Sequence, residues 1–227
     1  RRRGYAWWAL AGAAAAAAVV FLLGRGGTGP ASSSGTATGG SSRLRIVLAG
    51  TALGASLGSV TGIITMVDSA AFDAHRFWVV GSLAGRDMAT VEATAPFVLV
   101  GAVMTLILCG PLNVLLLGED SAAALGVRVG PVRVLALAAI TLLAGGSTAL
   151  AGPVAFVGLV VPHVLRLLLG PDLRRLMPLA LVAGPCLVLA SDIIGRVVAA
   201  PAEIAVGVVT AFLGAPTLLW LVVRGRS

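Results

Sequence analysis

Asp192 and Arg196 have the clearest chemistry in this sequence, because both are ionisable and both lie in the long apolar stretch 176–199. They stand four residues apart, so on a helix they share one face and can form an ion pair. Ionisable residues within a membrane span are costly and mark functional sites by default. The spacing predicts either a structural ion pair or an Arg196 side chain that presents its charge to an outside partner.

The other residues suited to catalysis or metal binding are isolated in the sequence. His163 follows Pro162 in a short apolar stretch and is interpreted as a helix–helix hydrogen-bonding residue. Cys109 and Cys186 each lie inside an apolar run, where cysteine behaves as a small hydrophobe. The sequence has no Walker A loop, no GxGxxG motif and no His-Glu-x-x-His pattern. We therefore expect no catalytic residue, no metal ligand, no disulfide and no nucleotide site in this chain.

A third candidate is the segment 118–133, which reads GEDSAAALGVRVGPVR. Its first residues, Gly118 to Ser121, are typical of a helix start, and Gly126 is typical of a helix end. Acidic residues come first and arginines follow. The pattern predicts a short helix between two apolar stretches, either lying on a membrane or docking into a soluble partner.

The composition excludes a soluble domain and favours a membrane protein. Of the 227 residues, 58% are hydrophobic and 11% are charged, and the mean hydropathy is +1.03. Soluble domains carry about 25% charged residues, because their surfaces must be solvated. The net charge of +7 comes from arginine alone, and the arginines lie in gaps between apolar runs, which indicates membrane topology rather than nucleic-acid binding.

Seven apolar stretches predict an all-α, polytopic transmembrane bundle that forms one domain over residues 1–227. Unpaired backbone groups are not tolerated in lipid, so each stretch is expected to be a helix. The stretch at 154–169 is short and is predicted to be tilted or broken. A flexible Gly/Ser/Thr loop is expected at 24–42 and a mixed-charge connection at 68–93. The stretches are 5–23, 46–67, 94–117, 132–151, 154–169, 176–199 and 203–223.

Arginine counting predicts the orientation of the chain. With a cytoplasmic C-terminus, the segments 118–133 and 166–175 and residues 25–45 fall inside, and each of these carries arginines. The outer connections then hold Arg76, Arg86 and Arg196. This asymmetry agrees with the positive-inside rule.

Several blocks, taken in order, resemble the FecCD-type permeases of ABC importers for ferric siderophores, haem and vitamin B12. The resemblance extends over about residues 43–226. The matching blocks are Phe77-Trp78 with the following Gly81–Gly85, LLLGEDSAAALGV at 115–127, AGPVAFVGLVVPHVLRLLLGPDLRR at 151–175, SDIIGR at 191–196 and PAEIAVGVVTAFLGAPTLLWL at 201–221.

The resemblance implies one subunit of a multi-subunit transporter in a bacterial plasma membrane. Such permeases have about ten helices and pair with a second permease subunit, identical or related. Two copies of an ATP-binding subunit sit on the cytoplasmic side, and a substrate-binding protein docks outside. The segment 43–67 with a short helix near Phe77–Gly85 matches pore-lining and outer-gate elements. We therefore expect about seven of the ten helices here and a longer intact gene product.

The resemblance also implies roles for individual residues. The family's coupling helix, which inserts into a cleft of the ATPase, matches the segment 118–133. An arginine that meets a glutamate of the binding protein matches Arg196. ATP and magnesium are then bound by the partner, and this chain binds no cofactor and is not an enzyme. The expected coupling residues are Glu119, Asp120, Ser121, Ala122, Ala123, Ala124, Leu125, Gly126 and Val127.

These observations favour inward transport of a ferric siderophore or a related iron chelate, haem or cobalamin. The alternative is an ABC permease for bare metal ions such as zinc or manganese. That pore would need clustered His, Asp or Glu ligands, whereas His163 and Asp192 stand alone in the sequence. An intramembrane enzyme would need paired catalytic groups, and a seven-helix receptor would not need the segment 118–133.

Overall fold

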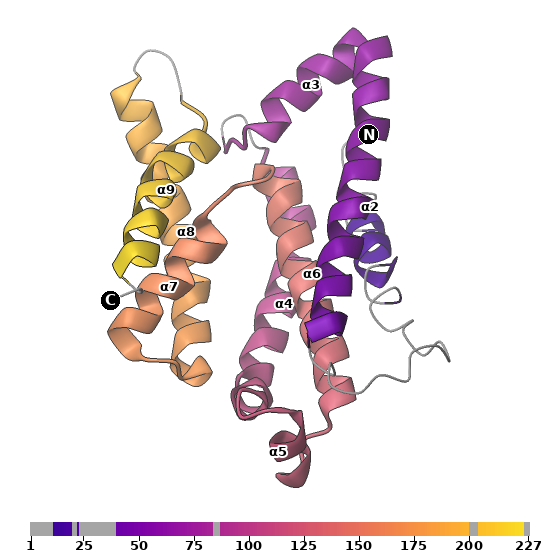
Figure 1. The fold of residues 1–227 in the computed structure, drawn as a ribbon. Helices are drawn as coiled ribbons and strands as arrows, with labels where there is room; N and C mark the ends of the chain where they lie inside the picture. Colours follow the sequence, from indigo (N-terminus) through magenta and orange to yellow (C-terminus); the bar gives the residue numbers. More distant parts are fainter. Residues whose placement is uncertain (1–10, 20–21, 23–39, 84–86, 200–203, 225–227) are drawn as a thin grey trace.

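The computed structural model describes residues 11–19, 22, 40–83, 87–199 and 204–224 (Figure 1). Within these ranges the chain forms helices joined by turns and short irregular segments, with no β-strand. This confirms the expected all-α bundle. The helices described from Gly40 onward are α2 (Gly40–Val67), α3 (Ser69–Val79), α4 (Met88–Leu115), α5 (Glu119–Ala124), α6 (Val129–Ala151), α7 (Val157–Leu169), α8 (Leu173–Val198) and α9 (Val206–Arg224).

Four of the described helices are long and apolar enough to cross a membrane. They are the Val47–Val67 part of α2 together with the whole of α4, α6 and α8. Two shorter apolar helices accompany them, α7 and the described Val206–Thr217 part of α9. The long helices agree with four of the seven predicted stretches, and α7 agrees with the stretch predicted to be short.

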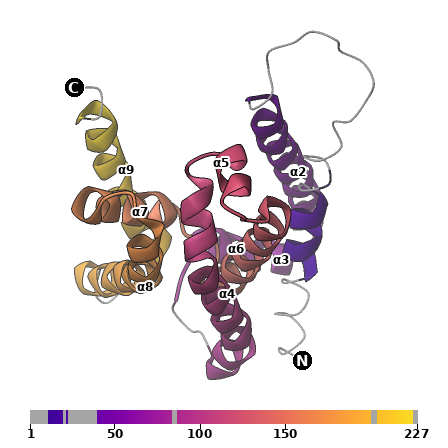
Figure 2. The same ribbon diagram turned by 90° about the horizontal axis from the view of Figure 1, so that it is seen from below.

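The helices form three groups that lie next to one another (Figure 2). In the middle α4 packs against α6, on one side α7, α8 and α9 pack together, and on the other side α2 contacts α3. Contacts between α4 and α8 join the first two groups. No residue in the apolar Val47–Val67 part of α2 is buried inside this chain. Its apolar surface is therefore left for lipid or for other helices.

Three helices begin with an aspartate that caps free backbone N–H groups. Asp68 Oδ1 accepts the N–H of Ala70 at 2.9 Å, and Asp172 Oδ1 accepts that of Arg174 at 3.0 Å. Asp87 caps α4 in the same way. Aspartate is among the best residues for this position, because its side chain satisfies a donor that the helix cannot. These caps place the starts of α3, α4 and α8.

The region before α4 differs from the prediction in two places. The connection predicted at 68–93 contains the 11-residue helix α3, which the Asp68 cap starts directly after α2. That helix ends at Val79, so the short helix expected near Phe77–Gly85 is wrong in its bounds. In the predicted loop 24–42, residues 40–42 belong to α2, and residues 24–39 lie outside the described part of the chain.

The predicted stretch 154–169 is broken at its start, and α7 begins only at Val157. Gly152 has φ 77° and Phe156 has φ 68°, and neither value is compatible with a right-handed helix. Figure 1 shows the resulting extended segment descending from the end of α6 to α7. The stretch is therefore interrupted at its start, as the interpretation of a broken helix requires, and is one continuous helix from Val157 to Leu169, while its tilt in a membrane stays a prediction.

Three segments meet at the end of the bundle where α3 ends: 80–83, 152–156, and 204–207, the last of which includes the first two residues of α9. We call this meeting point the three-segment junction. The N–H of Ser82 donates to the carbonyl of Ala151 at 2.9 Å, and the N–H of Gly207 donates to the carbonyl of Gly81 at 3.3 Å. Irregular backbone needs such partners, because lipid offers none. The junction thereby ties α3 to both α6 and α9.

Glycine is required at position 152 of this junction for two reasons. Its φ of 77° is unfavourable for any residue with a Cβ, and a Cβ added there would lie 2.5 Å from the carbonyl oxygen of Trp78. We therefore expect Gly152→Ala to lower the free energy of unfolding by about 1–3 kcal/mol, the typical cost of such backbone strain. The measurement is thermal unfolding of the purified permease in detergent.

Gly158→Ala is the matched control, because a Cβ at position 158 meets no atom within 4 Å and the residue lies inside α7. Alanine is preferred over glycine in a helix by about 0.5–1 kcal/mol. The Gly158→Ala protein should melt at or slightly above the temperature of the unmodified protein. Equal melting temperatures for the two variants would show that the junction tolerates a side chain.

Candidate functional site at the two ends of the bundle

α5 is a short helix at the end of the bundle where α4 ends and α6 begins (Figure 1). Gly118, with φ 102°, precedes it, and Gly126, with φ 81°, follows it. Ala122 is fully buried, and α5 contacts both α4 and α6. The predicted short helix between Gly118 and Gly126 is confirmed, and Ala122 holds it against its own chain.

An ion pair connects α5 to α6. The guanidinium group of Arg133 donates to the carboxylate of Glu119. Both side chains are more than half exposed, at 54% and 57%, so the pair is a surface pair. Such pairs contribute at most about 1 kcal/mol to stability. The pair therefore adds little to what holds α5 in place, and the buried Ala122 is the stronger contact.

The outward face of α5 is small and apolar at its centre. Ala123 and Ala124 are exposed, and Leu116, Leu117 and Leu125 are 58%, 67% and 65% exposed. We call these five residues, together with the exposed Glu119 and Asp120, the α5 surface. Exposed apolar residues ringed by charge are typical of a protein interface.

The structure divides the nine predicted coupling residues into two classes. Ala122 is buried and Val127 is half-buried, so neither belongs to the α5 surface. Leu116 and Leu117 belong to it and were not in the predicted set. A leucine at the end of an apolar run gives no signal in the sequence that it is exposed. The predicted residues that are exposed are Glu119, Asp120, Ser121, Ala123, Ala124, Leu125 and Gly126.

The turn between α7 and α8 lies at the same end of the bundle as α5 (Figure 1). Asn113, in the last turn of α4, accepts the N–H of Leu173, the first residue of α8, at 3.0 Å through its Oδ1. The sequence analysis missed Asn113. The signal that could have found it is a lone amide side chain near the end of an otherwise apolar run.

The Asp192–Arg196 pair lies near the opposite end of α8. Arg196 Nε donates to Asp192 Oδ2 at 2.8 Å, which confirms the predicted ion pair. The Asp192 side chain is 17% exposed and that of Arg196 is 44% exposed. Because α8 has 26 residues, the pair is separated from the helix start by most of a length of about 39 Å. The α5 surface and Arg196 therefore lie at opposite ends of the bundle.

Arg196 lies in the last turn of α8, close to the three-segment junction. The N–H of Ile204 donates to the carbonyl of Gly195 at 3.4 Å, which brings the segment before α9 beside this turn. Asp192 holds the Arg196 guanidinium group from inside the bundle, because the carboxylate is the more buried partner. The arrangement leaves nearly half of the arginine side chain at the surface.

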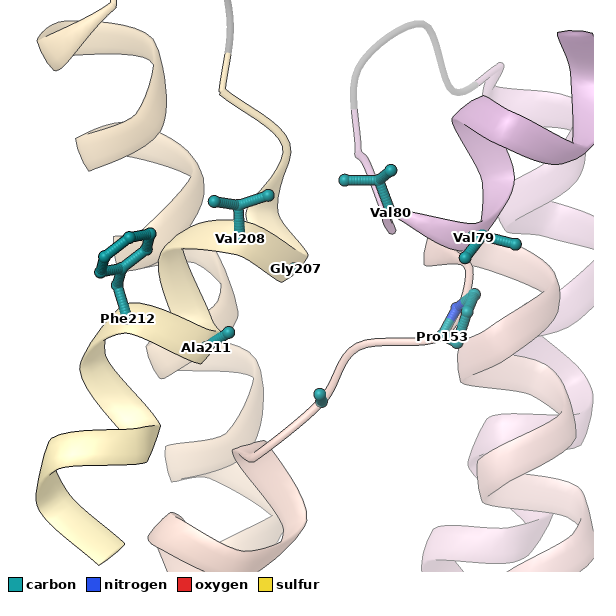
Figure 3. Close-up of a pocket in the computed structure, with 8 residues that line it drawn as sticks. Val79, Val80, Pro153, Gly207, Val208, Ala211 and Phe212 are labelled. Carbon is teal, nitrogen blue, oxygen red and sulfur yellow. The ribbon is translucent and has the colours of Figure 1, made fainter. Parts of the chain in front are cut away.

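An open apolar pocket of about 310 Å³ lies at the three-segment junction (Figure 3). Its lining comes from the end of α3, the extended segment before α7 and the first two turns of α9. All of its side chains are apolar, so it offers no charged group to a ligand. The lining residues are Val79, Val80, Pro153, Ala155, Gly207, Val208, Ala211 and Phe212.

His163 and the cysteines are not brought together with other possible ligands. The His163 side chain on α7 is exposed, so it does not lie between helices of this chain as the interpretation of a helix–helix contact requires. Cys109 is buried and Cys186 is exposed, and both are free thiols. Across the described ranges, no group of three or more His, Cys, Asp and Glu side chains is arranged to hold a metal ion.

The profile of the FecCD transport family matches residues 2–224. The chain is 45% identical over 183 residues to the ferric enterobactin transport system permease protein FepD of Escherichia coli, covering 81% of this chain and 54% of that one. It is 36% identical over 184 residues to the hemin transport system permease protein HmuU of Yersinia pestis, with 81% and 55% covered. The chain thus spans about half the length of these relatives.

A solved structure has the same fold. It shows an inward-facing conformation of a transporter of the metal-chelate ABC type, and it superimposes with a TM-score of 0.79 at 27% identity. The match covers 92% of this chain and 63% of that one. The four long apolar helices agree with the expected multi-pass location in a bacterial plasma membrane. Because the profile matches nearly the whole sequence, the chain belongs to the FecCD transport family.

Proposed function

We propose that this chain is part of the transmembrane permease subunit of an ABC importer. The importer moves a ferric siderophore, or a related iron chelate, haem or cobalamin, inward with energy from a separate ATPase. The observation that carries the proposal is the 45% identity to the ferric enterobactin permease, which extends over 183 residues, 81% of this chain. Over this length, chance similarity does not account for such identity.

The geometry supports different roles for the two ends of the bundle. The α5 surface offers small, exposed residues that a cleft of an ATP-binding subunit can enclose. Arg196 offers a charged group at the other end, where a carboxylate of an extracytoplasmic binding protein can pair with it. In this scheme the complex has two ATP-binding subunits and a second permease subunit, identical or related.

The chain itself catalyses no covalent step in this proposal. ATP and magnesium belong to the ATP-binding partner. The segment 43–67 in α2, which matches pore-lining elements of the family, has largely apolar and small residues, and such a lining suits passage of a bulky cargo without tight binding. Cargo selection then rests mainly with the binding protein. The surrounding partner is membrane lipid, and nucleic acid has no part in the scheme.

A permease for bare zinc or manganese ions is the competing function. The relatives quoted above are named for an iron chelate and for haem, and the similar solved structure is of the metal-chelate type, which favours the chelate. A third relative, the vitamin B12 import system permease protein BtuC of Vibrio cholerae, is 41% identical over 185 residues. Cobalamin is therefore kept among the candidate cargoes.

Uptake in a deletion strain tests the proposal. The gene is removed and restored, and uptake of radiolabelled ferric siderophores, haem, cobalamin, zinc and manganese is measured in parallel. A control strain carries an ATPase that cannot hydrolyse ATP. We expect one chelate or cobalamin to be taken up only with both the gene and the active ATPase. Uptake of a bare ion alone would establish the competing function instead.

A further inference from the structure

The end of α4 contacts the start of α8 at the end of the bundle that carries α5. The polar element of this contact is the hydrogen bond from the N–H of Leu173 to Oδ1 of Asn113, 3.0 Å long. The first N–H groups of a helix have no partner inside the helix. Asp172 caps the N–H of Arg174, so the N–H of Leu173 depends on Asn113, a residue of another helix.

This hydrogen bond is shielded from water and repeated by a second contact one turn deeper. Leu173 is buried, with 8% of its surface exposed, so no solvent molecule easily replaces the Asn113 acceptor. Cys109 lies four residues before Asn113 on α4, Met177 lies four residues after Leu173 on α8, and Cys109 Sγ is 3.5 Å from Met177 Sδ. Two contacts in matching register on antiparallel helices prevent α4 and α8 from sliding past each other.

Asn113 is also close to α5 along the chain. The link from α4 to α5 is held by consecutive backbone hydrogen bonds, in which the N–H groups of Leu116, Leu117 and Gly118 donate to carbonyls three residues earlier. It is therefore a tight turn and not a loose loop. Because Ala122 anchors α5 to the bundle, a displacement of α5 must move the last turn of α4 with it.

α8 carries such a displacement to the opposite end of the bundle. It stays helical through Pro178 and Pro185 and ends in the turn that holds Asp192 and Arg196. We propose that Asn113 is a positioning residue that clamps the start of α8 to the end of α4, so that movement of α5 reaches Arg196. This inference rests on the proposed function, because it assumes that α5 meets the ATPase and that Arg196 meets the binding protein.

Two substitutions at position 113 separate the hydrogen bond from the size of the side chain. Asn113→Asp keeps an oxygen that can accept the N–H of Leu173. Asn113→Leu keeps the same number of side-chain heavy atoms with the same branching and has no acceptor. The pair is compared in the full permease, assembled with its ATPase and binding protein in lipid nanodiscs. The quantity measured is the dissociation constant of the binding protein, with and without a non-hydrolysable ATP analogue.

In the unmodified complex we expect the nucleotide to change this dissociation constant by about 5–150-fold, the usual range of coupling between two sites. Asn113→Asp should keep that ratio. Asn113→Leu should bring it close to one while leaving the nucleotide-free constant within about twofold, since Arg196 itself is untouched. If Asn113 had a merely structural role, its substitution would raise the dissociation constant of the binding protein both with and without the nucleotide.

Leu173→Pro removes the donor of the same hydrogen bond together with the buried leucine side chain, so only a loss no larger than that of Asn113→Leu is attributed to the hydrogen bond. Proline has no N–H and is well tolerated at the first position of a helix, and Asp172 already has the extended ψ of 110° that proline requires before it. Leu173→Pro should lower the ratio of the two dissociation constants, measured with and without nucleotide, as Asn113→Leu does. The double variant should lower this ratio no more than either single variant.

Several results overturn the inference while leaving the proposed function intact. Among the variants they are full coupling in Asn113→Leu, equal loss in Asn113→Asp and Asn113→Leu, joint weakening of binding with and without nucleotide, and additive losses in the double variant. An unmodified complex whose affinity for the binding protein does not respond to nucleotide also overturns the inference. An unmodified permease that binds neither the ATPase nor the binding protein overturns the proposed function, and the inference with it.

Discussion

Ala123→Glu should abolish cargo uptake while the partner ATPase continues to hydrolyse ATP. Ala123 is exposed at the centre of the α5 surface, and a glutamate there would be buried without a counter-ion when the ATPase encloses the helix. An uncompensated buried charge costs about 3–5 kcal/mol. That corresponds to a loss of roughly 100-fold or more in productive engagement of α5. The measurement is uptake and ATP hydrolysis in the same proteoliposomes.

Ala123→Ser is the matched control, because it changes size and charge very little at the same position. It should retain most of the uptake. Ala122→Glu serves as a contrast, since Ala122 is fully buried against its own chain and its substitution should reduce folding and expression. Transport that is unchanged in Ala123→Glu would remove α5 from the coupling role.

Arg196→Glu is expected to weaken docking of the binding protein by about 10–100-fold. Hydrogen bonds that involve a charged group contribute about 1.5–3 kcal/mol, and the substitution also sets a negative charge against the partner's carboxylate. The side chain is 44% exposed at the end of α8, so a partner can reach it. The check is a binding isotherm of the binding protein on the reconstituted permease.

Asp192→Asn distinguishes docking from an internal structural role. It removes the charge that Arg196 pairs with inside the chain but leaves the arginine in place. Docking should then stay within about threefold of the unmodified value, a difference below 1 kcal/mol. Equal weakening in Arg196→Glu and Asp192→Asn would mean that the ion pair matters only for the local fold. Since exposed charges are screened by salt, the Arg196 effect should also shrink at high ionic strength.

The long helices were predictable from the sequence because hydropathy records which segments can lie in lipid. The stretches that became α4, α6 and α8 were found within a few residues of their ends. The bounds of α3 were not found, and the helix was expected near Phe77–Gly85, because a segment that contains Asp73, His75 and Arg76 resembles a polar connection. Its start is fixed by the Asp68 cap, a local signal that hydropathy does not record.

The candidate site was predictable where the chemistry is local in sequence. The Asp192–Arg196 pair follows from a spacing of four, and the short helix α5 follows from its flanking glycines. The inward orientation of Ala122 was not predictable, because three consecutive alanines carry no pattern that tells one face from another. The Asn113–Leu173 contact joins residues 60 positions apart, and such a pairing exists only once the helices have packed.

The three-segment junction is connected through main-chain atoms, from Ser82 to Ala151 and from Gly207 to Gly81. Main-chain connections do not depend on which side chains surround them. Mutation can therefore reshape the apolar wall beside the junction, at Val208 or Phe212 for instance, without breaking the links that hold it together.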